Sequence, residues 1–459
     1  MVIAIGVSLL ALAAGAAWVS QTFLYGEDPN ISLTWEYVGI ASAMGALVFV
    51  LPPLLKRTQS GLPLLAFVLL AGIGMRLFMF GSLPVLEDDY HRYLWDGAQV
   101  ANGVDPYKYS PAISAPFDEF GNPVPYPEAE DLQVLRDEAE LNRDLHYRIN
   151  YPFIKTIYPP LAQGAFALAH WINPYDLNAW RWVLLFVDLL AFALCLGALH
   201  AKGLGSHWVA LYWWNPVIIL EVFNSGHMDV LMTPFLFGAL WAAYSGRRYI
   251  GAVALAGAAA IKLWPAILMA AMARPYLKRP IHFIGVSALF GVAALVLLLP
   301  QLVHLGDPYQ GLTAYSQGWQ THAFVFKLLA EGLGALFANP ESIARAVTGL
   351  AVIGTTVWLA LRSPEDGSGT AMAMLGAAGT LLLLSPTGYP WYLTWIAPFL
   401  VFAPRAGFLA LLITAPLYYT RFLLDNDGIR YEWMILPVAF GVPLLLILAD
   451  LVRKRPIYG

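Results

Sequence analysis

The feature that most constrains this chain is a series of long apolar segments, each about as long as a membrane-spanning helix. Twelve ranges qualify: 2–21, 33–55, 61–81, 179–199, 207–223, 228–246, 281–303, 344–361, 369–385, 388–404, 406–423 and 431–451. A helix needs about 20 mainly apolar residues to cross the hydrocarbon core. Only 12% of the 459 residues are charged, roughly half the share found in soluble domains. The sequence therefore predicts an all-α polytopic membrane protein with roughly twelve spanning helices.

Clusters of lysine and arginine predict how these helices are oriented. Seven clusters fall on one side of the membrane under a single threading: Lys56-Arg57, Lys202, Arg247-Arg248, Lys278-Arg279, Arg362, Arg405 and Arg453-Lys454-Arg455. Because such clusters mark cytoplasmic loops, this threading places residues 82–157 on the outer face. That segment has no N-x-S/T sequon, which suits a bacterial inner membrane protein. We read residues 1–20 as the first spanning helix, because no basic stretch precedes the apolar one.

Three more apolar pieces fit badly as full spans: 158–172, 249–273 and 323–338. The middle piece has basic residues on both sides and is broken by Trp264-Pro265. Broken backbone is tolerated at membrane depth only where protein or a water-filled cavity covers it. We therefore expect short re-entrant or interfacial helices here, and the re-entrant alternative implies an internal cavity.

The segment 82–157 is the one large polar stretch of the sequence, and Glu87–Pro111 is its most unusual part. Three carboxylates, Glu87 to Asp89, directly follow a hydrophobic run. If a helix begins near Asp88 and ends at Gly103, the i, i+3, i+4, i+7 rule puts four residues on one face: Asp89, Arg92, Tyr93 and Asp96. This face either supplies a general base at the membrane surface or is an ordinary solvated helix face.

Ionisable groups beside apolar runs are costly, so each is a candidate functional residue. The densest group is 221–229, which contains Glu221, Asn224, His227 and Asp229. These residues either cap helix ends or take part in metal binding, although His227 and Asp229 have no third ligand adjacent in sequence.

Two isolated cations also need an anion nearby. Lys262 lies in an apolar run, so its ammonium must pair with a lipid phosphate or with a carboxylate. Arg421 is suited to holding a phosphate, or pairs with Asp425 one turn later in the sequence.

Aromatic residues beside proline mark several helix starts, at Tyr158-Pro159, Trp214-Asn215-Pro216, Trp264-Pro265 and Tyr389-Pro390-Trp391. Such residues anchor helices at the membrane interface, and they can also line a sugar or isoprenoid site. The outer segment 307–324 adds Trp319 and His322.

The same sequence argues against other classes of site. No glycine-rich phosphate loop follows a predicted strand, so a nucleotide site has no support. The net charge of −4 gives no basic surface for nucleic acid. The single Cys195 rules out an intrachain disulfide or a cysteine metal cluster.

Taken together, these segments resemble the GT-C-type integral membrane glycosyltransferases. The most similar are the polyprenol-phosphate-mannose-dependent mannosyltransferases of glycosyltransferase family 87 and relatives of GPI mannosyltransferase I. The resemblance lies in the order of seven motifs: Glu87-Asp88-Asp89-Tyr90, Gly103-Val104-Asp105-Pro106-Tyr107, Tyr158-Pro159-Pro160-Leu161, Trp214-Asn215-Pro216, Gly226-His227-Met228-Asp229, Lys262-Leu263-Trp264-Pro265, and Ser385-Pro386 with Pro390-Trp391-Tyr392. Residues 56–459 would form the GT-C-like catalytic domain, and residues 1–55 would be additional N-terminal helices.

The resemblance implies a polyprenyl-phosphate sugar as donor and a lipid or glycan as acceptor. One of Glu87, Asp88 and Asp89 would be the general base, and we choose Asp89. The resemblance and the two isolated cations together suggest that the donor phosphate is held by Lys262, His227 and Arg421. The expected substrate-binding residues are Tyr90, Arg92, Asp96, Tyr158, Asn224, Asp229, Trp319, His322, Tyr389 and Trp391.

Two alternatives stay open. The acidic triplet is also a suitable ligand set for a divalent metal, and the resemblance names no other cofactor. The competing function is a multi-pass transporter or flippase for a lipid-linked or small-molecule substrate. Transporters commonly consist of two matching halves, and neither half of this chain repeats the acidic motif.

Overall fold

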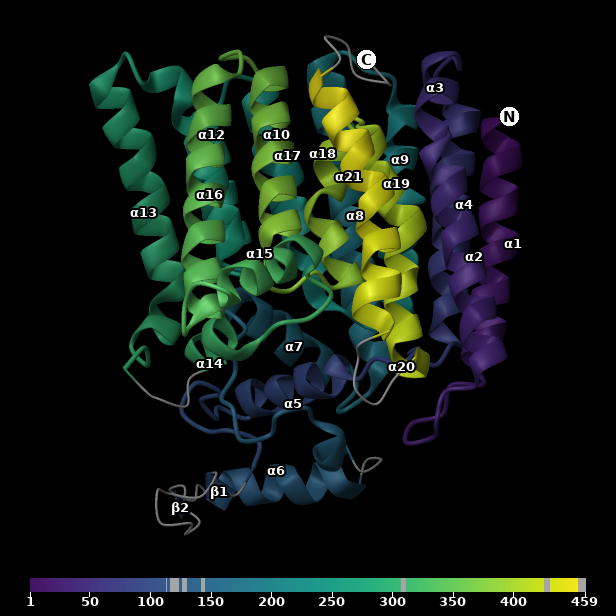
Figure 1. The fold of residues 1–459 in the computed structure, drawn as a ribbon, viewed down its shortest axis with the longest axis vertical. Helices are drawn as coiled ribbons and strands as arrows, with labels where there is room; N and C mark the ends of the chain where they lie inside the picture. Colours follow the sequence, from purple (N-terminus) through teal and green to yellow (C-terminus); the bar gives the residue numbers. More distant parts are fainter. Residues whose placement is uncertain are drawn as a thin grey trace.

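The computed structural model of the chain describes residues 1–112, 114–115, 124–125, 130–141, 145–306, 311–424 and 430–452. Within these residues, nine helical segments are long and apolar enough to cross a membrane. They are α1 (Val2–Ser20), α2 with α3 (Ile31–Phe49 and Leu51–Lys56), α4 (Leu62–Phe80), α8 (Leu177–Lys202), α13 (Pro280–Leu302), α16 (Pro340–Arg362), α17 (Gly367–Leu384), α19 to α20 (Ala406–Thr414 to Arg421–Leu424) and the segment ending in α21 (Leu436–Val452). They stand side by side in one bundle (Figure 1). The predicted all-α polytopic architecture is confirmed.

The three other predicted spans are broken into short pieces. Range 207–223 holds η2 (Ser206–Val209), α9 (Ala210–Trp213) and the π-helical η3 (Ile218–Asn224). Range 228–246 holds η4 (Met228–Met232) and α10 (Thr233–Tyr244), and range 388–404 holds η7 (Pro390–Trp395) and α18 (Ala397–Leu400). Each range contains a proline, which lacks an amide hydrogen and clashes with the preceding turn of a helix.

The three pieces that fit badly as spans are indeed short. They form α7 (Pro160–Ile172), the series α11 (Arg248–Ala259), η5 (Trp264–Leu268), α12 (Met269–Ala273) and η6 (Arg274–Tyr276), and finally α15 (Phe324–Gly334). In the middle piece the chain leaves helical geometry between Ala259 and Trp264, so the predicted break is confirmed. The C-terminal third adds η8 (Ala415–Thr420) and the π-helical η9 (Tyr431–Ile435).

The predicted polar segment gathers at one end of the bundle, away from the start of α1 and the end of α21 (Figure 1). It contains α5 (Asp89–Ala101), α6 (Glu130–Leu141) and η1 (Leu145–Arg148), and α14 (Gly311–Gly318) lies at the same end. Two short strands, β1 (Ser114–Ala115) and β2 (Val124–Pro125), pair antiparallel. The predicted acidic helix is confirmed: Asp88 is its N-cap residue, and Gly103 follows it with a φ of 74°.

A buried ion pair joins α4 to α8 inside the bundle. Arg76 Nε lies 2.7 Å from Asp188 Oδ2, and both side chains are fully buried. Arg76 also donates to the carbonyls of Gly72 and Trp213, and its guanidinium stacks over the Trp213 ring. Because an unpaired charge in a low-dielectric interior is strongly destabilising, this pair fixes the register of the two helices.

Helix α5 is held against α7 by a close backbone approach at Gly97. A Cβ atom at this position would lie 2.4 Å from the Phe166 carbonyl oxygen. Only a glycine therefore allows the acidic helix to pack this tightly on α7, which sets where Asp89 lies relative to the bundle.

We predict that Gly97→Val destabilises the protein by about 1–3 kcal/mol, because overpacking forces α5 away from α7. The measurement is thermal unfolding of purified protein in detergent. Gly164→Val in α7 is the matched control, because a Cβ there has no atom within 4 Å. Equal melting temperatures for the two variants would contradict the close-packing argument.

Candidate active site

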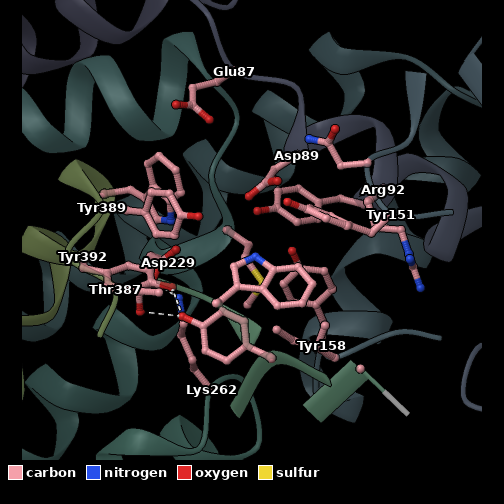
Figure 2. Close-up of a pocket in the computed structure, with 18 of the residues that line it drawn as sticks. Glu87, Asp89, Arg92, Tyr151, Tyr158, Asp229, Lys262, Thr387, Tyr389 and Tyr392 are labelled. Atoms are coloured by element: carbon pink, nitrogen blue, oxygen red, sulfur yellow. Dashed lines mark hydrogen bonds and ion pairs between the residues drawn. The ribbon is translucent and has the colours of Figure 1, made fainter. Parts of the chain in front are cut away.

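A cavity of about 550 Å³ lies where the acidic helix meets the broken segments, a size typical of ligand sites. Figure 2 shows its wall, with Glu87 and Asp89 across the cavity from Lys262. The lining comes from α5, the chain around Tyr151 and Tyr158, the turn at Lys262, α14, and the segments around Tyr389 and Arg421. Of the three pieces that fit badly as spans, 158–172 and 249–273 supply lining residues and 323–338 supplies none. Range 388–404, which we predicted as a full span, also lines the cavity.

Asn224 fixes the chain that delivers the carboxylates. Its side-chain nitrogen donates to Ser82 Oγ at 2.8 Å and to the Leu83 carbonyl at 2.7 Å, and its oxygen accepts from the Val85 amide at 3.1 Å. Leu86 then has a φ of 54°, a conformation that costs energy in a residue with a Cβ and is concentrated at functional sites. This turn brings Glu87 and Asp89 to the cavity wall.

His227 lies between these two carboxylates. Its Nδ1 is 3.8 Å from Asp89 Oδ2, and its Nε2 is 3.8 Å from Glu87 Oε2. The imidazole is fully buried and stacks on Trp391 with ring centroids 3.7 Å apart. Neither ring nitrogen has a hydrogen-bond partner among the described residues. His227 therefore lies between the two acids but is not one of the residues that line the cavity.

Burial changes the acidity of the three carboxyls. Removal from water, helped by the nearby Asp88 charge, raises the pKa of Asp89 to about 7, while the Lys262 ammonium opposes the rise. Burial and the neighbouring Asp89 raise the pKa of Glu87 well above its usual range. Asp88 also has a raised pKa because of burial, although a hydrogen bond from Asn150 opposes it. Asp89 still exposes 33% of its side chain, so it can reach a bound molecule.

The Lys262 ammonium pairs with Asp229. Lys262 Nζ lies 2.7 Å from Asp229 Oδ1, and the same oxygen accepts from Trp395 Nε1 at 2.7 Å. Lys262 also lies over the rings of Tyr392 and Trp395, at 4.3 and 5.0 Å from their centroids. This pairing is the carboxylate alternative left open by the sequence. The side chain is 25% exposed, so the ammonium has hydrogens left to donate to a ligand in the cavity.

Two guanidinium groups also line the cavity. Arg92 is committed elsewhere, since its Nε donates to Asp96 at 2.7 Å and its Nη1 to the Ile154 carbonyl at 2.8 Å. Arg421 contacts the Tyr418 hydroxyl at 3.2 Å, and within the described residues no carboxylate lies within 4 Å of it. Asp425, the alternative partner of Arg421, lies outside the described residues.

Aromatic rings cover much of the remaining wall. Tyr389 and Trp391 stack with centroids 4.3 Å apart, and Trp319 lies against Tyr151 at 4.6 Å. Our sequence reasoning named Tyr389, Trp391, Trp319 and Tyr158 but missed several lining residues: Tyr151, Tyr315, Thr387, Trp395 and Tyr418. Tyr315 donates or accepts at Thr387 and Tyr392, and no local pattern distinguishes it from other interfacial tyrosines.

Four predicted substrate contacts lie outside this lining. Asp96 is fully buried and accepts from Arg92 and Gln163, Asn224 holds the acidic segment, and His322 bonds to Tyr431. Tyr90 borders a second cavity. Asp96 and Asn224 thus position lining residues, and the substrate roles of all four stay predictions. Among the described residues, no group of three or more His, Cys, Asp or Glu side chains is arranged to hold a metal ion.

Comparison with known families adds to this geometry. The model of glycosyltransferase family 87 matches residues 156–386, about half of the chain. The chain belongs to glycosyltransferase family 87. The matched range includes Asp229 and Lys262, whereas Glu87, Asp88 and Asp89 precede it.

Two curated relatives come from Mycobacterium tuberculosis. One is a polyprenol-phosphate-mannose-dependent alpha-(1-2)-phosphatidylinositol pentamannoside mannosyltransferase, 26% identical over 64% of this chain and 65% of that protein. The other is an alpha-(1->6)-mannopyranosyltransferase A, 23% identical over 71% of this chain and 62% of that protein. The match therefore spans less than two thirds of the length of each relative.

Proposed function

We propose that this protein is a membrane mannosyltransferase that moves mannose from a polyprenyl-phosphate donor to a hydroxyl of a lipid or glycan acceptor. The observation that carries the proposal is the sharing of one cavity by the Asp89 carboxylate and the cations Lys262 and Arg421. Family membership and the donor named for one relative support the same chemistry. The competing function, a transporter or flippase, has no such support from the relatives.

The reaction we propose is a single displacement. The acceptor hydroxyl oxygen forms a bond to the anomeric carbon, while the bond from that carbon to the phosphate oxygen breaks. The electron pair of the broken bond leaves with the polyprenyl phosphate, and the proton of the hydroxyl passes to the Asp89 carboxylate. Attack on the side opposite the leaving phosphate inverts the configuration of the anomeric carbon.

Asp89 is the best-placed base among the three carboxylates. Its side chain faces the cavity (Figure 2), whereas Asp88 accepts a hydrogen bond from Asn150 and Glu87 is 7% exposed. A base is most effective when its pKa is near the working pH, and the pKa of Asp89 is about 7. The Asp88 charge would assist by keeping that pKa high, and a supporting role for Glu87 stays a prediction.

The departing phosphate needs positive charge at the place where it leaves. Lys262 and Arg421 both line the cavity, and cations already in position stabilise developing negative charge without reorganisation. Asp229 and Trp395 hold Lys262 in place. The stacked Tyr389 and Trp391 rings would pack against the sugar or the first isoprene units. His227 would act indirectly, by keeping Glu87 and Asp89 apart.

We further propose that this site faces the periplasm of a bacterial inner membrane. Helix α4 starts near Lys56-Arg57 and ends at the acidic segment, so these basic residues lie at the end of the bundle away from α5. Since basic clusters mark the cytoplasmic side, α5 and the cavity would lie on the outer side. A lipid-linked donor can reach such a site sideways from the bilayer.

We predict that Asp89→Asn lowers turnover by about 10²–10⁴-fold, the usual contribution of a general base. Purified protein would be given radiolabelled polyprenyl-phosphate mannose, or the glucose analogue, with a membrane lipid extract as acceptor. Glu140→Gln on α6 is the control, because it changes an acidic residue outside the cavity lining. Near-native transfer by Asp89→Asn would show that another group is the base.

The pH dependence of the wild-type enzyme gives a separate prediction. A protonated carboxyl cannot accept a proton, and the raised pKa of Asp89 is about 7. The rate constant kcat/KM should therefore fall about tenfold per pH unit below this value and level off above it. In Asp89→Asn, the residual kcat/KM should no longer fall at low pH. A wild-type profile that stays flat down to pH 5 would contradict the assignment.

We predict that Lys262→Ala raises the KM for the donor about ten- to a hundredfold, since a hydrogen bond to a charged group contributes about 1.5–3 kcal/mol. The KM for the acceptor should change less. Initial rates with each substrate varied in turn measure both values. Lys278→Ala, which removes an exposed lysine outside the cavity lining, is the control. An unchanged donor KM in Lys262→Ala would remove Lys262 from the phosphate site.

A further inference from the structure

A second cavity, of about 470 Å³, adjoins the first along the acidic segment. Leu86, Glu87 and Asp88 line both cavities. The rest of the second wall comes from the loop between α1 and α2 (residues 22–29), together with Leu83, Pro84, Tyr90 and Arg148. The N-terminal helices, which the sequence suggested were an addition, therefore reach the carboxylates of the proposed active site.

The first end of the loop between α1 and α2 is attached to the chain that leads into the acidic segment. Ser20 Oγ accepts a hydrogen bond from the Leu83 amide at 3.2 Å, and the Gln21 side chain donates to the Gly81 carbonyl. At the other end, Asn30 caps α2 through the Leu33 amide. The Tyr25 ring stacks under the Arg148 guanidinium at 4.4 Å and lies edge-on to His91. These contacts hold this loop in place as one wall of the second cavity.

The charges of the two cavities differ. The first contains the cations Lys262 and Arg421 beside its carboxylates. The second has four carboxylates, from Glu27, Asp28, Glu87 and Asp88, against the single guanidinium of Arg148. Such a cavity disfavours a phosphate. Carboxylates accept hydrogen bonds from hydroxyl groups, and the rings of Tyr25 and Tyr90 offer apolar faces, so a neutral, hydroxyl-rich molecule fits it best.

The Glu87 carboxyl gives an independent indication that a ligand donates a hydrogen bond beside the second cavity. Its side chain is 7% exposed, and its Oε1 has no hydrogen-bond partner among the described residues. A buried acceptor without a partner costs about 1–3 kcal/mol. Because Glu87 borders both cavities, its carboxyl lies on the way from the second cavity to the first, where Asp89 is.

We infer that the second cavity is the acceptor subsite, which binds the sugar end of a glycan so that one hydroxyl passes Glu87 to reach Asp89. This inference rests on the proposed glycosyl transfer and assigns a substrate-binding role to the N-terminal loop. Tyr25 stacks on the acceptor sugar, and Glu27 accepts from its hydroxyls. The donor occupies the first cavity, where the cations are.

The test uses the full-length protein in detergent with α-(1→6)-mannobiose as the probe. Binding is followed by saturation-transfer difference NMR, which does not depend on turnover. We expect Tyr25→Ala and Glu27→Gln each to weaken mannobiose binding at least about fivefold, as expected for the loss of one good contact. The control is Trp35→Ala, which removes an exposed ring on α2 outside both cavity linings. Thermal unfolding checks that each variant is folded.

The same variants are then assayed for transfer from polyprenyl-phosphate mannose to mannobiose. The KM for mannobiose should rise at least about fivefold in both, and the donor KM should rise less. Unchanged mannobiose binding in both variants, or displacement of mannobiose by inorganic phosphate, would overturn the acceptor assignment. If the wild-type protein binds mannobiose through Tyr25 and Glu27 but transfers no sugar, the proposed function fails while the subsite stands.

Discussion

The rest of this structure depends on the rule that a charge placed inside a lipid-embedded bundle needs a partner. Arg76 and Asp188 meet this need within the bundle, and Lys262 with Asp229 and Arg92 with Asp96 meet it at the cavity. Among the described residues that line the cavity, Glu87 and Asp89 have no lysine or arginine within 4 Å, and Arg421 has no carboxylate within 4 Å. Asp89 and Arg421, which the proposed reaction uses, thus lack such a partner, whereas Lys262, which it also uses, is paired with Asp229.

The cavity lies beside several apolar segments that stop being regular helices. Prolines interrupt the ranges around Met232 and Trp391, and the chain near Lys262 leaves α11 before η5 begins. Backbone groups freed in this way must be covered by protein or water. Several of these segments line one cavity together with α5 and the start of α7, which leaves a partly open space with polar and aromatic walls. A site for a lipid-linked donor can thus be built without a separate nucleotide-binding domain.

The sequence predicted the acidic helix well because its signals are local. The start near Asp88, the spacing from Asp89 to Asp96 and Gly103 after the last turn are all signals within a few residues. The same reasoning found Lys262 and Asp229 separately but left the partner of Lys262 open, since the two residues are 33 positions apart in the chain. It also grouped Asn224 and Asp96 with the substrate contacts, which stays a prediction; the structure shows hydrogen bonds by which both hold other residues in place.

The sequence alone determined an all-α membrane protein with broken segments and an acidic helix at one end. The signals were the lengths of the apolar segments, the positions of the prolines and the basic clusters, all of which are local. Which side chains meet was decided only by tertiary packing. The loop between α1 and α2 lines a cavity with Glu87, Arg421 shares a cavity with Asp89, and Trp395 donates a hydrogen bond to Asp229. These contacts join segments tens to hundreds of residues apart, and their distances depend on how whole helices pack, which no local pattern of residues encodes.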